Sequence, residues 1–533
     1  MDTLDWVVVG GYFFVMVGIG VWSRGRISTI ADFFTAGGRM PWWLSGISHH
    51  MSGYSAVMFV AFAAEAYRLG LTVYIWWALT IGVGVGIGAF LWAPAWNRLR
   101  SKHGVKSPLE YLAIRYDVPT QQIMAWAGAA LKVVDIAAKW VAVAVLLQGF
   151  AGVDVWVGIL IVGVVTMVYS VLGGLWADAL TDFGQFVIQG FAGIAMFVAV
   201  AAHFGGIDFV WTMWDRLPAS HSEPLTGPYT LVFFMALFLI KTLEYNGGMW
   251  NLAQRYMAAP SGAAARRSAL LSAVLWLVWP LVLFLPMWAA PLIVPGMEAN
   301  AEQAYVEMGK AMLPAGMVGL VLAGFFSHTM AMVSSDANVI AAVITRDMLP
   351  RLWKRATGLS ADAQLKLARL TTFLFIGFSM TIALTADTKG FVLKIVIALV
   401  AATMGPIAIP LMLGLLPPFR RVGPLAAKAS VIGGLGTWAF LYWQQQFEKA
   451  EWVTQGVIVS WPLVLSLVLY LSIGFLRPQP SPEREALVES LRTDAATGET
   501  LSVAVDAEVE RGDAERGEGR GGGGRGASRS EKG

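Results

Sequence analysis

The sequence contains no cysteine among its 533 residues. Structural disulfides, thiolate metal sites and iron–sulfur clusters are therefore excluded. Charged residues are also scarce, at 14% of the chain, whereas soluble domains carry roughly 25%. Hydrophobic residues make up 57% of the chain and occur in long runs. These features predict an all-α integral membrane protein.

The hydrophobic runs divide the chain into spans. A helix that crosses the hydrocarbon core needs about 20 apolar residues, and by this rule we expect about 13 transmembrane helices. The expected spans are residues 5–23, 41–67, 71–96, 122–150, 154–174, 179–204, 229–257, 267–294, 313–346, 367–386, 391–416, 425–443 and 455–476. They form one transporter domain over residues 1–476. Residues 477–533 are polar and rich in Pro, Gly and Arg, which predicts a disordered cytoplasmic tail and no nucleic-acid partner.

Basic residues predict the orientation of these spans in the lipid bilayer. They cluster after every second span, whereas the intervening loops at 208–223 and 298–307 are acidic. The positive-inside rule then places the N-terminus outside and the C-terminus in the cytoplasm of a cell (plasma or inner) membrane. The basic residues concerned are Arg24, Arg26, Arg39, Arg98, Arg100, Lys102, Lys106, Arg255, Arg266, Arg267, Arg351, Lys354, Arg355, Arg420 and Arg421.

Two of the hydrophobic segments are interrupted by polar and glycine residues, at 46–55 (GISHHMSGYS) and at 241–248 (KTLEYNGG). Within lipid, such breaks persist only where they are buried in protein or line a cavity. One broken span in each half of a membrane protein indicates a transporter with its binding site near the bilayer midplane. The sequence therefore predicts secondary active transport of a small solute, and no enzyme activity.

The ionisable and hydroxyl side chains inside the spans supply candidate cation ligands. In residues 327–338 (SHTMAMVSSDAN), His328 and Ser335 share a helical face with Ser334 at its margin, and Asp182 opens another span. With free carbonyls of Ser48 and Met51 in the first break, these groups predict an all-oxygen site for a hard cation. The candidate cation-binding residues are Ser48, His50, Met51, Asp182, His328, Ser334 and Ser335, with no cofactor and no metal beyond sodium.

Each candidate also has a structural interpretation. His328 could be a hydrogen-bonded core residue, and Asp182 could be stabilised by a helix dipole. Asp135 and Lys139 neutralise one another at i, i+4 spacing. Lys241 and Glu244 could do the same, or could contact solute. The candidate solute-binding residues at the two breaks are Ser52, Tyr54, Ser55, Lys241, Glu244, Asn246 and Met249.

Over residues 5–476 the chain resembles the solute:sodium symporter family, which includes sodium/sugar, sodium/proline and sodium/iodide carriers. The shared motifs are residues 36–39 (AGGR), 107–116 (SPLEYLAIRY), 169–177 (YSVLGGLWA), 181–185 (TDFGQ), 254–259 (QRYMAA) and 345–347 (TRD). The resemblance implies the leucine-transporter-type fold, with inverted five-helix repeats at about 41–204 and 229–416. It also implies cation-coupled symport by alternating access.

The same resemblance implies where sodium would bind. The main site of the family would use the His328 carbonyl and hydroxyls at positions 331 and 332, which here are Ala331 and Met332. A second site, found in some members, would use Asp182, Ser334 and Ser335. Two mechanisms therefore remain open. In the first, sodium binds at this second site. In the second, His50 or His328 carries a proton, with Asp182 or Asp336 as its partner.

Functions of other classes are less well supported by the sequence. A solute sensor built on a transporter fold would need a signalling domain, which the tail after Pro478 does not provide. A metalloenzyme would need His49, His50 and His328 to share one ion. The solute itself stays open among sugars, amino acids, carboxylates and anions, although by the family resemblance residues 53–55 (GYS) stand where sugar carriers place an acidic–amide pair, which does not support galactose-type recognition.

Overall fold

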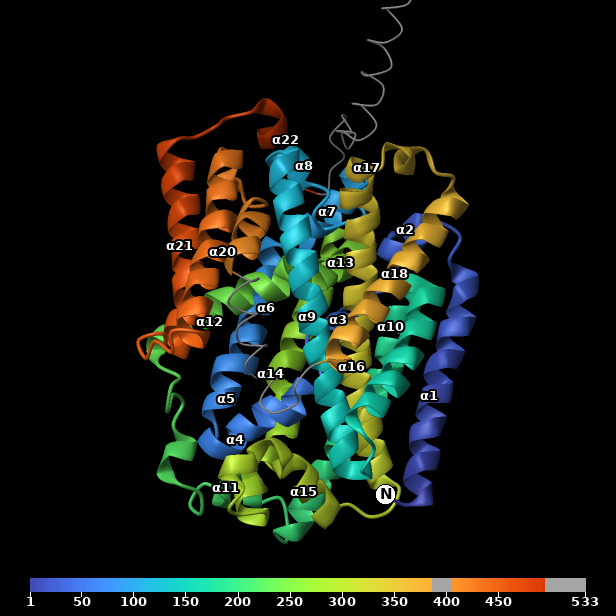
Figure 1. The fold of residues 1–533 in the computed structure, drawn as a ribbon, viewed down its shortest axis with the longest axis vertical. Coiled ribbons are helices and arrows are strands. Elements are labelled where there is room, and N and C mark those ends of the chain that lie inside the picture. The colour runs from blue at the N-terminus through green and yellow to red at the C-terminus, as the bar shows by residue number, and fades with distance from the viewer. Residues whose placement is uncertain (386–404, 494–533) are drawn as a thin grey trace, which may run out of the picture.

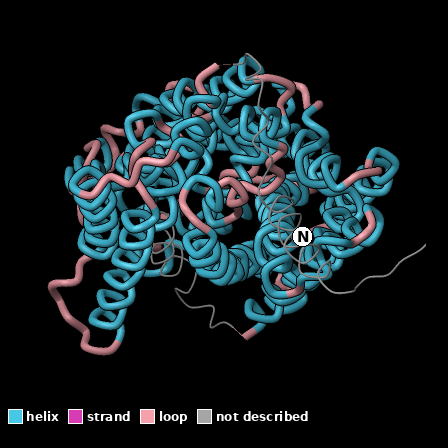
Figure 2. The backbone as a smooth tube through the Cα atoms, turned by 90° about the horizontal axis from the view of Figure 1, so that it is seen from above, coloured by secondary structure: helices cyan, strands magenta, loops and turns pink. Residues whose placement is uncertain are grey.

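The computed structural model describes residues 1–385 and 405–493. Over these residues the chain is helical and contains no strand (Figures 1 and 2). Eight of the described helices are long and apolar enough to cross a membrane. They are Thr3–Arg26, Thr72–Leu91, Val155–His203, Leu231–Gly248, Gly262–Ile293, Met317–Leu352, Ala361–Leu384 and Gly456–Leu476. The total of about 13 spans stays a prediction, since most of the expected span 391–416 lies outside the described residues.

The helices follow one another from the N-terminus to residue 490. Their bounds are α1 Thr3–Ser23, α2 Ile30–Thr35, α3 Trp42–Met51, α4 Ala63–Leu69, α5 Thr72–Tyr74, α6 Thr80–Leu91, α7 Ala93–His103, α8 Leu112–Arg115, α9 Val118–Ala151, α10 Val155–His203, α11 Phe209–Thr212, α12 Leu231–Leu243, α13 Trp250–Ala258, α14 Gly262–Ile293, α15 Ala304–Met312, α16 Met317–Ala342, α17 Leu349–Leu352, α18 Ala361–Leu384, α20 Pro424–Gln446, α21 Gln455–Leu476 and α22 Pro482–Ser490. Residues 405–413 are also helical.

Side-chain caps mark where several of these helices begin. The Asp117 carboxylate accepts a hydrogen bond from the Thr120 amide at the start of α9, at 2.8 Å. Thr230 caps α12 and Ser261 caps α14 in the same way. Because the first amides of a helix have no partner within it, such caps fix the residue at which a span starts.

The first helix break is shorter than the sequence suggested. Helix α3 continues to Met51, and the chain is non-helical only from residue 52 to residue 56. The expectation of an unwound stretch from residue 46 is therefore wrong. The Ser48 carbonyl is not free, because it accepts the Ser52 amide at 2.9 Å.

The second break is where the sequence placed it. A π turn over Glu244–Gly248 follows α12, and α13 begins at Trp250. Gly247 has φ 137°, and a Cβ atom there would lie 2.3 Å from Nε1 of Trp96. Only glycine suits this position, because a side chain would be strained and would clash.

A further bend separates the two expected spans 154–174 and 179–204, which are continuous in α10. Gly174 is the non-helical residue between them, with φ 49° and ψ −146°. A Cβ atom at Gly174 would lie 2.6 Å from the Phe33 ring. The second part of α10 packs against α16 and α3, which places its first turns beside the first break.

The segment expected to be a disordered tail begins with a helix. In α22, Leu487 and Val488 are buried, and Oγ of Ser490 lies 2.7 Å from Nε2 of His103 in α7. The start of α1 and helix α22 lie at opposite ends of the molecule (Figure 1). The expectation of disorder from residue 477 is thus wrong for α22, and residues 494–533 lie outside the described part.

Candidate functional site

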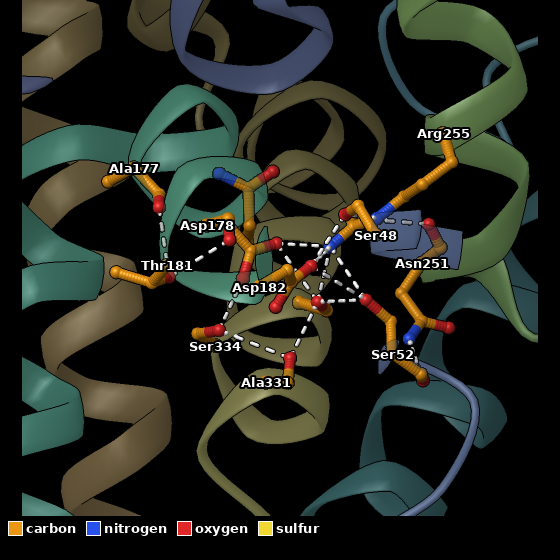
Figure 3. Close-up of polar contacts among 12 residues, drawn as sticks. Ser48, Ser52, Ala177, Asp178, Thr181, Asp182, Asn251, Arg255, Ala331 and Ser334 are labelled. Atoms are coloured by element: carbon orange, nitrogen blue, oxygen red, sulfur yellow. Dashed lines mark hydrogen bonds and ion pairs between the residues drawn. The ribbon is translucent and has the colours of Figure 1, made fainter. Parts of the chain in front are cut away.

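Two buried carboxylates lie one helical turn apart in α10, just after the Gly174 bend. Asp178 is 1% exposed and Asp182 is fully buried. At i, i+4 spacing both project from the same face of the helix, towards α3, α13 and α16 (Figure 3). We call Asp178, Asp182 and the polar side chains that contact them the carboxylate cluster.

One guanidinium group joins the two carboxylates. Arg255, from α13, forms an ion pair with Asp178 and lies 3.5 Å from Oδ2 of Asp182. Among the described residues, it is the one basic side chain paired with either carboxylate. Its Nε also donates to Ser48 at 3.0 Å. With both acids ionised, the cluster therefore carries one uncompensated negative charge, which is costly inside a membrane protein.

Serine hydroxyls complete the cluster. Ser48 donates to Oδ2 of Asp182 at 2.5 Å, and Ser52 donates to the same oxygen at 3.3 Å. Ser334 and Ser335 donate to Asp178. The other carboxylate oxygen of Asp182, Oδ1, is buried and has no hydrogen-bond partner among the described residues. A buried carboxylate oxygen without a donor is a place where a cation would be stabilised.

The sequence predicted this site in part. Asp182, Ser48, Ser334 and Ser335 are brought together, but Ser334 and Ser335 bond to Asp178 and not to Asp182. Ser48 contributes its hydroxyl, whereas a carbonyl was expected. The sulfur of Met51 accepts a hydrogen bond from Gln189 at 2.9 Å, and its carbonyl as a cation ligand stays a prediction.

The predicted histidines lie outside the carboxylate cluster. Nε2 of His50 lies 3.2 Å from the Tyr54 hydroxyl, which donates to Gln189 at 3.0 Å. The His328 ring lies 4.4 Å from the Tyr54 ring, measured between centroids. Nδ1 of each of these two histidines has no partner among the described residues. Neither is paired with Asp182 or Asp336, so the expected proton partners are wrong.

A cavity that is partly open to solvent lies between the two helix breaks. Tyr54 and Ser55 line it from the first break, and Lys241, Glu244 and Met249 line it from the second. These are five of the seven residues that the sequence predicted for solute. The other lining residues are Gly53, Val57, Met58, Phe62, Trp77, Leu131, Lys132, Asp135, Lys139, Tyr245 and Met332.

The remaining two predicted residues have other roles. Ser52 lies in the carboxylate cluster, 2.7 Å from the Ser335 hydroxyl. The Asn246 amide donates to the backbone carbonyls of Gly84 at 2.8 Å and Thr242 at 2.7 Å. Asn246 thereby stabilises the backbone next to the second break and does not line the cavity.

Three ion-paired lysines contribute to the cavity wall. Lys241 lies 2.7 Å from Glu244. Lys139 lies 2.7 Å from Asp135 and 3.3 Å from Asp336. Lys132 lies 3.0 Å from Asp336 and 3.4 Å from Asp135. The pairing of Asp135 with Lys139 that the sequence predicted is confirmed, within a network of two acids and two lysines.

The sequence reasoning missed Asp178, Arg255 and Lys132. Asp178 stands one turn before Asp182, so helical spacing alone could have placed both carboxylates on one face. Arg255 was assigned to a basic loop, because it follows the apolar part of its span. No sequence pattern showed that it turns back into the bundle, since this depends on where α13 begins after the second break.

Comparisons with known proteins identify a family and a similar fold. A sequence model of the sodium:solute symporter family matches residues 33–426. The sodium/sialic acid symporter NanT of Aliivibrio fischeri is 24% identical over 88% of this chain and 93% of the relative. The human sodium/iodide cotransporter is 26% identical over 82% of this chain and 69% of the relative. The structure of a Na⁺-coupled sialic acid symporter in a substrate-bound outward-open state superimposes with a TM-score of 0.76, at 23% identity, covering 90% of this chain and 99% of that one.

Proposed function

The chain belongs to the sodium:solute symporter family, and we propose that sodium binds at the carboxylate cluster while the solute binds in the cavity between the helix breaks. It is a multi-pass membrane protein with the leucine-transporter-type fold, and it couples the transport of a solute to sodium. Sodium coupling, and not proton coupling, is the mechanism that the relatives favour.

The presence of two carboxyl groups but one guanidinium in the carboxylate cluster is the observation that carries the sodium assignment. Asp178 and Asp182 face one guanidinium, that of Arg255, and Oδ1 of Asp182 is buried without a partner. With both acids ionised, one sodium ion would neutralise the cluster. Hydroxyls of Ser48, Ser52, Ser334 and Ser335 supply further oxygen atoms nearby, and oxygen is the ligand atom that hard cations prefer.

The position of the cluster gives a physical basis for coupling. Ser48 belongs to the last turn of α3 and Ser52 to the first break, Arg255 belongs to the helix after the second break, and Asp178 and Asp182 belong to α10. A cation held among them ties both broken spans to α10. Sodium would therefore favour one arrangement of these helices over another, which is how an ion can bias alternating access.

We also propose that the N-terminus faces outside and the cytoplasmic surface carries α22. Basic helices α7 and α17 lie at the same end of the molecule as α22, opposite the N-terminus (Figure 1). This distribution agrees with the positive-inside rule and with insertion in a plasma or inner membrane.

The sodium assignment is tested by thermal stability of the purified protein. Replacing potassium chloride by sodium chloride at equal concentration should raise the Tm of the wild type, since a ligand that binds the folded state stabilises it. Asp182→Asn should abolish this rise. Asp362→Asn, which alters an exposed ion pair on α18, should keep it. A full sodium-dependent rise in Asp182→Asn would refute the assignment.

A further inference from the structure

The charges around the cavity balance. Its wall presents the ammonium groups of Lys132, Lys139 and Lys241 and the carboxylates of Asp135 and Glu244. Asp336 lies behind the wall and pairs with both Lys132 and Lys139. Three positive groups therefore meet three negative groups. A solute with a net charge would leave one buried charge uncompensated, which is costly.

Groups of both charges also line the cavity surface. Asp135 has a side chain that is 21% exposed, whereas Lys132 and Lys139 behind it are 6% and 4% exposed. Asp135 is thus the accessible acid of its network. At the second break, Lys241 pairs with Glu244, and each side chain is 6% exposed. Asp135 on α9 and Lys241 at the end of α12 both line the cavity, so a solute between them faces a carboxylate and an ammonium group.

The rest of the wall is apolar and aromatic. Phe62, Trp77, Met58, Met249 and Met332 line it. Two phenolic hydroxyls are already engaged. Tyr54 donates to Gln189 at 3.0 Å, and Tyr245 donates to the Gly53 carbonyl at 2.6 Å. Few neutral donors and acceptors remain for the many hydroxyls of a sugar, whereas aromatic faces suit an ammonium group or an apolar body.

We infer that the cavity binds a small zwitterion, a solute with one ammonium or quaternary ammonium group and one carboxylate on an apolar body. The ammonium group lies against Asp135 and the carboxylate against Lys241. The inference rests on the proposed function, because the cavity is the solute site only if the chain transports a solute there. Sodium would neutralise the carboxylate cluster, and a zwitterion would add no net charge to the cavity. Both occupied sites would then be free of net charge.

The test compares zwitterions with isosteres that lack one charge. Purified full-length protein in sodium chloride is melted with leucine, 4-methylpentanoate or 3-methylbutylamine. A second set is glycine betaine, 3,3-dimethylbutanoate and ethyltrimethylammonium, and glucose completes the panel. At least one zwitterion should raise the Tm, and its two isosteres and glucose should not. An equal rise with a monocarboxylate, a monocation or glucose overturns the inference, as does the absence of a rise with both zwitterions.

Charge variants separate recognition from general damage. In Asp135→Asn the wall gains one net positive charge, so 4-methylpentanoate or 3,3-dimethylbutanoate should bind more tightly than to wild type, by about tenfold if the gain is 1.4 kcal/mol. Glu244→Gln should shift preference in the same direction. Lys241→Met should favour the amines instead. If every ligand lost affinity to the same extent in variants that still fold, the inference would be overturned. The sodium-only rise in Tm reports the carboxylate cluster separately, so failure of one proposal is distinguishable from failure of the other.

Discussion

Arg255 lies 3.5 Å from Asp182 while it forms its closer ion pair with Asp178. Through these two contacts a single guanidinium holds the helix after the second break against α10. Ser48, in the last turn of α3, and Ser52, in the first break, attach the first broken span to the same group, because Arg255 donates to their hydroxyls at 3.0 and 2.9 Å. The two interrupted spans are thus connected through one side chain.

Removing Arg255 should be costly, and the cost should depend on Asp178. Arg255→Met leaves two buried carboxylates without a basic partner, which we expect to destabilise the protein by about 3–5 kcal/mol. Arg255→Met/Asp178→Asn removes one of these charges and should recover part of the loss. Unfolding measured in potassium chloride checks both variants. Equal destabilisation of the single and double variants would show that the carboxylate charge is not what Arg255 compensates.

Gly247→Ala should impair transport by moving the second break. Its Cβ atom would clash with Trp96, whose indole donates to the Asn246 carbonyl at 2.9 Å. The φ of 137° is also strained for alanine. Gly190→Ala is the matched control, because nothing lies within 4 Å of a Cβ atom there. Sodium-driven uptake of whichever solute the screen identifies should fall in Gly247→Ala and not in the control. Wild-type uptake in Gly247→Ala would show that the break tolerates a side chain.

Helix α22 should contribute to stability. Leu487, Val488 and Leu491 are buried, and Arg98 donates to the Leu491 carbonyl at 2.6 Å. Truncation after residue 480 removes these contacts and should lower the Tm. Truncation after residue 493 keeps them and should leave both Tm and uptake near wild type. If the two truncated proteins melt alike, α22 adds nothing to the fold.

Acid stability should depend on Asp32, in the segment between α1 and α3. Burial raises the pKa of Asp32, but hydrogen bonds from Thr29 and Ser28 outweigh it and hold the pKa below its usual range. The ionised form therefore stabilises the folded protein above the unfolded-state pKa of about 3.9, and this contribution is lost as the pH falls through the lower folded-state pKa. Between about pH 5 and pH 3, the Tm of wild type should fall more steeply than that of Asp32→Asn. Parallel curves would contradict the prediction.

The sequence predicted the fold well because each membrane-spanning helix corresponds to a continuous run of apolar residues. The second break was also visible, since Gly247 and Gly248 interrupt such a run. The first break was placed too early, because polar residues such as Ser48 and His49 remain helical when tertiary partners satisfy them. His49 lies 2.7 Å from Ser272 and 3.0 Å from the Tyr245 carbonyl, one partner for each ring nitrogen.

The site was harder to predict than the fold, because its pairings depend on how helices pack. Asp182 was identified from its position inside a span, yet its serine partners are Ser48 and Ser52, not Ser334 and Ser335. Lys132 and Asp336 are 204 positions apart and meet only through the packing of α9 against α16. Spacing along a helix predicts contacts within it, such as Asp135 with Lys139, but not the partner across an interface.

Direct binding of radioactive sodium to the purified protein tests the sodium assignment most directly. The wild type should bind sodium saturably, and Asp182→Asn should weaken binding by about tenfold or more, while Asp362→Asn binds like wild type. Sodium affinity unchanged in a folded Asp182→Asn protein would place the coupling ion elsewhere and contradict the carboxylate cluster as its site.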